Sequence, residues 1–187
     1  MLFLKRLFQT HRFQSEGRAL YRQIAERARR PLLFTAYGVP DTIDGRFEML
    51  CLHAYAVFHG LKGKGADADV LAQVVYDAMF ADLDGSLREL GVADLGVGKR
   101  IKTMTEALNG RIQAFDAAAD SAALTEAVRR NVYGTATPAE AQVRAMTKYL
   151  QQMRTALAAV AFKDLCAARF VWPEPAEPML ETTNAAS

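Results

Sequence analysis

The stretch GVADLGVGKRIKTM at residues 91–104 places glycines ahead of a lysine, which is the composition of a loop that binds phosphate. A phosphate-binding P-loop has the pattern GxxxxGK followed by Ser or Thr, whose hydroxyl holds a magnesium ion. Here Val97 and Gly98 follow Gly96, and Arg100 stands where that hydroxyl belongs. The preceding LRELG has the pattern of a helix end, whereas a P-loop follows a strand. We therefore interpret Gly91 as the residue that closes one helix before a turn into the next.

Other reactive residues lack the spacing of a catalytic or metal site. His53 and His59 are six residues apart, so they lie on different sides of a helix, and the chain has no HExxH motif. Cys51 and His53 are two residues apart, which turns a nucleophile and its base away from each other. DLDG at residues 82–85 lacks the spacing of a calcium loop. The sequence therefore predicts no catalytic residue, no metal site and no cofactor, and His53 is interpreted as a hydrogen-bonded core residue.

A further set of charged residues lies close together, namely Asp41, Asp44, Arg46 and Glu48. These side chains have the chemistry of an acid–base group. A structural role explains these residues better, because Asp44 is expected to cap a helix and Asp41 to form the turn after Pro40.

The composition is that of a folded globular protein. Of the 187 residues, 51% are hydrophobic and 24% are charged, which suits one domain with a single core. The two cysteines are far apart and form no CxxC motif, which excludes zinc and redox motifs and indicates a reducing compartment. No apolar run is long enough to span a bilayer.

The two ends of the chain differ from its middle. Residues 1–12 form an amphipathic, basic N-terminal arm, typical of a segment that lies on an anionic membrane. There are two alternatives for the arm: it packs on the helices, or it contacts RNA through charge alone. Residues 171–187 are rich in proline without periodicity, which predicts a flexible tail. The candidate membrane-surface residues of the arm are Leu2, Phe3, Leu4, Lys5, Arg6, Leu7 and Phe8.

Helical periodicity dominates the rest of the chain, and no segment alternates like a strand. Residues 47–61 are apolar on nearly every face, which is typical of a central helix. The sequence TPAE predicts the start of another helix, with Thr137 as N-cap. Together these patterns predict an all-α, single-domain bundle of about six to seven helices over residues 13–170. The helix that TPAE begins has its apolar positions over residues 143–160, and the other predicted helices cover residues 16–30, 70–90, 97–115 and 121–131.

Two longer stretches resemble a known family. They are YGVPDTIDGRFEMLCLHAYAVFHGLK at residues 37–62 and MFADLDGSLRELGVADLGVGKRIKTMTEALNGRIQAF at residues 79–115. Together they resemble the ubiquinol–cytochrome c chaperone family, and the resemblance extends over about residues 18–170. The pair of motifs YGxPDTxDGRFE and LRExGVxDLxVGKR is specific, although Ala93 stands where the family pattern has glycine. We expect a compact, bacterial-type member.

The resemblance implies an assembly factor and not an enzyme. Such a chaperone would bind newly made cytochrome b and promote assembly of the ubiquinol–cytochrome c reductase complex, respiratory complex III, at the inner membrane. The partners implied are cytochrome b or other complex III components, a small helical partner protein or the ribosome, and a peripheral membrane contact, but no DNA. The implied location is the bacterial cytoplasm at the inner membrane, with the mitochondrial matrix as the alternative.

Two irregular segments carry most of the family signature, and we hypothesise that they approach each other and frame a client or partner surface. The alternative is that both are intramolecular joints, in which Arg46 or Arg100 pairs with Asp41 or Asp94. The candidate client-binding residues are Tyr37, Pro40, Asp41, Arg46, Phe47, Asp94, Lys99 and Arg100.

Two other functions stay open at this point. One is a general helical adaptor that binds another protein and has no connection to respiration. The other is a bundle that binds haem or a small molecule through His53 and a methionine such as Met49 or Met104.

Overall fold

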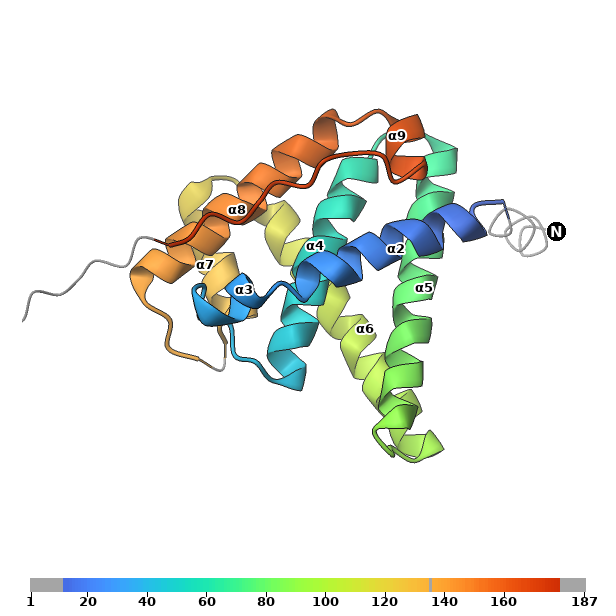
Figure 1. Cartoon of the computed structure of the whole chain (residues 1–187), viewed down its shortest axis with the longest axis horizontal. Helices are drawn as coiled ribbons and strands as arrows, with labels where there is room; N and C mark the ends of the chain where they lie inside the picture. Colours follow the sequence, from blue (N-terminus) through green and yellow to red (C-terminus); the bar gives the residue numbers. More distant parts are fainter. Residues whose placement is uncertain (1–11, 135, 179–187) are drawn as a thin grey trace, which may run out of the picture.

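The computed structural model describes residues 12–134 and 136–178, and in these ranges the chain forms eight helices and no strand (Figure 1). The prediction of an all-α, single-domain bundle is confirmed. The helices exceed the predicted number because two of them have only five residues. They are α2 (Gln14–Ala28), α3 (Pro31–Thr35), α4 (Ile43–Leu61), α5 (Ala66–Glu89), α6 (Asp94–Ala117), α7 (Ser121–Val132), α8 (Glu140–Ala159) and α9 (Phe162–Cys166).

Helix α4 is the centre of the bundle, as its sequence predicts. It is packed against α2, α5, α6, α7 and α8, and most of its residues are buried. Its start is capped by Thr42, whose Oγ1 accepts a hydrogen bond from the backbone N–H of Gly45 at 3.1 Å. The prediction that Asp44 is the cap is therefore wrong. Asp44 instead lies in the first turn, where its charge is favourable next to the positive end of the helix dipole.

Helices α5 and α6 form a long hairpin whose end projects from the rest of the molecule (Figure 1). Gly91 has φ of +79° and closes α5, as predicted. The backbone N–H groups of Gly91 and Val92 donate to the carbonyl groups of Arg88 at 2.9 Å and Leu87 at 3.1 Å. This hydrogen-bond pattern is the Schellman motif, which a glycine at this position favours. The glycines of the opening stretch therefore shape a turn between two helices.

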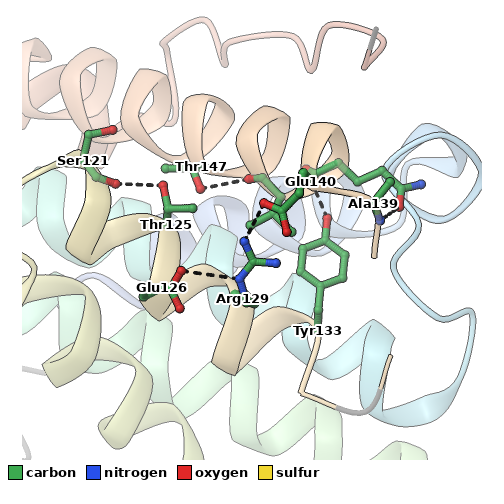
Figure 2. A network of polar contacts seen from close by, with 10 residues as sticks. Ser121, Thr125, Glu126, Arg129, Tyr133, Ala139, Glu140 and Thr147 are labelled. Atoms are coloured by element: carbon green, nitrogen blue, oxygen red, sulfur yellow. Dashed lines mark hydrogen bonds and ion pairs between the residues drawn. The ribbon is translucent and has the colours of Figure 1, made fainter. Parts of the chain in front are cut away.

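Figure 2 shows how α7 is fixed beside the start of α8. The Arg129 guanidinium contacts Glu140 at 2.8 Å and Glu126 at 3.4 Å. Helix α8 begins at Glu140, and the backbone N–H of Ala139 donates to Oε1 of Gln142 at 2.9 Å. The prediction that Thr137 is the N-cap is therefore wrong, because the chain enters the helix two residues later.

The segment after α9 has no regular secondary structure, but it is not loose. Between residues 171 and 178 the indole of Trp172 is buried, and its Nε1 donates to Oε1 of Gln23 at 3.0 Å. Glu174 contacts Arg27 at 2.7 Å and also Arg30. The prediction of a flexible tail is therefore wrong for residues 171–178. Residues 179–187, like residues 1–11 of the predicted arm, lie outside the described ranges.

None of the described helices is both long enough and apolar enough to cross a membrane.

Candidate functional site: two adjoining pockets at the start of α4

The loop from Tyr37 to Thr42 is anchored in the core at one end. The Tyr37 side chain is buried, and its hydroxyl donates to the carbonyl oxygen of Ala176 at 2.7 Å. The backbone oxygen of Tyr37 accepts a hydrogen bond from the hydroxyl of Tyr133 at 2.8 Å. These bonds tie the loop to the C-terminal segment and to the end of α7. Tyr37 thus positions the loop and is not on an accessible surface.

The other end of the loop forms one wall of a pocket of about 330 Å³. Pro40 and Phe47 lie on this wall, and the middle of α6 lies across from them. The end of α7 closes the third side with Arg130 and Asn131. The contacts between α7 and α8 in Figure 2 hold α7 in this position. The side chain of Arg130 has no hydrogen-bond or ion-pair partner among the described residues.

A second pocket, of about 200 Å³, adjoins the first. Phe47 and Met104 line both pockets, so they form the ridge between them. The second pocket is more apolar and is formed by α2, α4, α5 and α6, with Ile43 among its lining residues. The Ile43 side chain is 56% exposed, which is unusual among the large hydrophobic residues of the described ranges. We call the two pockets together the Phe47 furrow.

A buried ion pair lines the first pocket. The guanidinium of Arg111, in α6, donates through Nε and Nη2 to both carboxylate oxygens of Glu48, in α4, and through Nη1 to the carbonyl of Ala107 at 2.8 Å. The side chains of Arg111 and Glu48 are only 18% and 13% exposed. Burial raises the pKa of Glu48, and the hydrogen bonds from Arg111 oppose that shift. The pair joins α4 to α6 and places a fixed charge pair in the lining of the first pocket.

Apart from Tyr37, which is buried, the predicted site residues fall into two groups. Pro40, Arg46 and Phe47 line the Phe47 furrow, whereas Asp41 lies beside it and pairs with Arg46 at 2.6 Å. This ion pair confirms the intramolecular alternative for these two residues. The remaining residues, Asp94, Lys99 and Arg100, lie at the start of α6, and none of them lines either pocket.

Within the second group, Asp94 contacts Arg88 at the end of α5, and not Arg46 or Arg100. Lys99 and Arg100 are exposed and have no ion-pair partner among the described residues. The first signature segment therefore contributes to the furrow, and the second forms the projecting turn of the α5–α6 hairpin.

Sequence reasoning missed Met104, Arg111 and Arg130 as lining residues of the furrow. A signal for the Glu48–Arg111 pair was present, because Glu48 is the one acidic residue within the apolar segment 47–61. A buried carboxylate requires a cationic partner, but the sequence does not indicate which of the many arginines provides it.

The geometry of His53 argues against haem binding through this residue. Its side chain is fully buried, with Nδ1 at 2.7 Å from the carbonyl of Met49 and Nε2 at 3.1 Å from the hydroxyl of Tyr149. Both ring nitrogens are therefore engaged, and the prediction of a hydrogen-bonded core histidine is confirmed. Burial lowers the His53 pKa to about 4. In the described ranges, no three His, Cys, Asp or Glu residues are grouped as metal ligands.

Comparison with known proteins gives a consistent result. The family model described as ubiquinol-cytochrome C chaperone matches residues 35–172. The crystal structure of the Cbp3 homolog from Brucella abortus is similar to this chain, with 32% sequence identity and a TM-score of 0.75. That similarity covers 92% of this chain and 95% of the Brucella protein. The comparison with curated proteins gave no significant match.

Proposed function

This chain belongs to the ubiquinol–cytochrome c chaperone family, and we propose that it is a non-catalytic assembly factor that binds newly made cytochrome b. Through this binding it promotes assembly of the ubiquinol–cytochrome c reductase complex at the cytoplasmic face of a bacterial inner membrane. The observation that carries the proposal is the family match, which extends from the loop before α4 to the buried Trp172.

The Phe47 furrow is the surface that we assign to the client. Its second pocket is lined mainly by apolar side chains, and Ile43 and Met104 lie where a partner can reach them. Cytochrome b is a membrane protein, so its unassembled segments present apolar side chains that need cover. Methionine suits such a surface because its flexible thioether adapts to different partners.

The pocket volumes indicate how the client is held. The second pocket, at about 200 Å³, is smaller than the range of about 300–1,000 Å³ that is typical of small-molecule sites. The first, at about 330 Å³, is at the low end of that range. Pockets of this size suit individual side chains of a protein partner. The unpaired Arg130 at the rim adds a cationic group that an acidic or carbonyl group of the client can meet.

A deletion strain of the source organism tests the function. We expect the deletion to lower the spectroscopic signal of cytochrome b and ubiquinol–cytochrome c reductase activity in membranes, while terminal oxidase activity persists. The wild-type gene should restore both. Normal complex III in the deletion strain would refute the assembly role, and an equal loss of all respiratory complexes would favour a general adaptor.

Photo-crosslinking tests the furrow separately. A photo-reactive phenylalanine analogue replaces Ile43, at the rim of the furrow, or Val171, which is 86% exposed and lies after α9. We expect cytochrome b among the products from position 43 and not from position 171. Equal crosslinking from both positions would exclude the furrow as the client surface. The same products would show whether a small helical partner or ribosomal proteins bind nearby.

A further inference from the structure

The end of the α5–α6 hairpin exposes apolar side chains that the bundle does not cover. We call residues 88–102 the hairpin tip. Leu95 is 94% exposed and Leu90 is 64% exposed, whereas the neighbouring Leu87 and Val97 are buried. The two exposed leucines are therefore not part of the apolar interior. Leu90, Leu95, Ile43 and Val171 are the exposed large hydrophobic residues of the described ranges.

Cationic side chains follow Leu95 along α6. Lys99 and Arg100 are exposed and without an ion-pair partner in the described part of the chain. Lys102 is 78% exposed and reaches Glu106 only at 3.9 Å. The tip has four basic and two acidic residues, a net charge of +2, and one of the two acids is Asp94, which contacts Arg88. The other acid, Glu89, is exposed beside Leu90 on α5, whereas the exposed charges that follow Leu95 on α6, namely Lys99, Arg100 and Lys102, are all positive.

The order of these residues along α6 matches the layers of a bilayer surface. Leu95, Lys99 and Lys102 follow at spacings of four and three, so they share one face of the helix. With a rise of about 1.5 Å per residue, the two lysines lie roughly 6 and 10 Å behind the leucine. Amphipathic protein segments bury apolar side chains roughly 5–10 Å into the headgroup and acyl boundary, and their lysines remain at the phosphates.

We propose that the hairpin tip docks on an anionic membrane surface, with Leu90 and Leu95 in the interface and Lys99, Arg100 and Lys102 at the lipid phosphates. A membrane suits this surface better than a protein groove, because the tip is a projecting end whose positive charge complements anionic lipid (Figure 1). Leu83 and Ser86, which line the Phe47 furrow, directly precede the tip on α5. Docking would therefore hold the furrow close to the bilayer. The inference concerns lipid alone and does not depend on the client proposal.

A fluorescent probe on the tip gives the direct test. The full chain carries Leu95→Cys together with Cys166→Ser and is labelled with an environment-sensitive dye, while Cys51 is buried and does not react. The matched control carries the same dye at Val171→Cys. The probes are vesicles of phosphatidylcholine alone or with one third phosphatidylglycerol. We expect a blue shift and quenching by brominated lipid at position 95, only with the anionic vesicles.

Unlabelled variants measure how the tip contributes to binding. Lys99→Glu with Arg100→Glu should weaken partition into anionic vesicles by at least about thirtyfold, since each basic residue near such a surface contributes roughly fivefold. Lys148→Glu with Lys163→Glu reverses two exposed charges on α8 and α9 and should have a much smaller effect. Leu90→Ser with Leu95→Ser should also weaken binding, whereas Val171→Ser should not.

Three outcomes would overturn the proposal. One is the absence of vesicle binding by the full chain. Another is binding in which the dye at position 95 stays in water, which would assign the membrane contact to another segment such as residues 1–12. The third is an equal response of the dyes at positions 95 and 171, which would mean that the dye itself drives insertion.

Discussion

Removing Arg111 should destabilise the protein in a way that depends on pH. The Arg111→Met variant keeps most of the side-chain volume but leaves the Glu48 carboxylate buried without a countercharge. The structure shows two hydrogen bonds between these side chains and a third from Arg111 to Ala107, with little solvent contact for either charge. Breaking such a pair typically costs 3–5 kcal/mol, and the remaining exposure favours the lower end, about 3 kcal/mol. For a chain of this length that corresponds to a fall in Tm of roughly 6–12 °C.

The pH dependence follows from the pKa of Glu48. Burial already raises this pKa in the folded protein, and loss of Arg111 should raise it further. When the folded pKa exceeds the unfolded one, the folded state holds the proton more tightly, and the free energy of unfolding falls as pH rises through the window between them. The variant should therefore be least stable at neutral pH, and its deficit relative to the wild type should shrink as the pH approaches 5.

Urea unfolding of the wild type and the variant at pH 7.5 and pH 5 measures both effects. The double variant Glu48→Leu with Arg111→Met should recover to within about 1 kcal/mol of the wild type, because an apolar pair avoids the buried charge. Arg129→Met, which breaks the more exposed contact with Glu140, serves as the control and should change stability much less. The reasoning would be refuted if Arg111→Met were as stable as the wild type at pH 7.5. It would also be refuted if the loss of unfolding free energy grew as the pH was lowered.

Three further changes test the packing around the site. Gly45→Ala should destabilise the protein by about 2 kcal/mol or more in thermal unfolding, because the added Cβ would lie 1.9 Å from the carbonyl oxygen of Pro40; an unchanged Tm would contradict this. Trp172→Ala should cost about 3–5 kcal/mol in urea unfolding, whereas truncation of a loose tail would cost nothing. His53 has a folded pKa of about 4, so the wild type should lose stability as pH falls from 6.5 to 4, and this slope should be shallower in His53→Gln.

Much of the fold could be predicted from local sequence patterns. The segment 47–61 identified α4 as the central helix, because a helix with apolar side chains on every face must be surrounded by other helices. The end of α5 at Gly91 could be predicted as well, since the Schellman motif depends on residues next to each other in the chain. These features have local causes, which a single sequence contains.

The site and the C-terminal segment depend on contacts that are distant in sequence. Glu48 and Arg111 are 63 positions apart, and no local pattern selects that arginine. Residues 171–178 have no helical or strand periodicity, so their packing depends on the fit of Trp172 against Gln23 and the ring of His53. The one tryptophan of the chain was a signal that this segment is buried, because so large an apolar side chain is seldom left in water.

The structure also separates two roles within the family signature. In the first motif, Tyr37 and Thr42 make hydrogen bonds inside the molecule, and Gly45 fits against the Pro40 carbonyl where no other residue would. Their presence in the signature follows from the fold and gives no information about a partner. In the second motif, Lys99 and Arg100 have no such intramolecular role in the described structure. Exposed basic residues that the fold does not require point to recognition outside the molecule, and for this reason we assign them to the membrane-facing tip instead of the furrow.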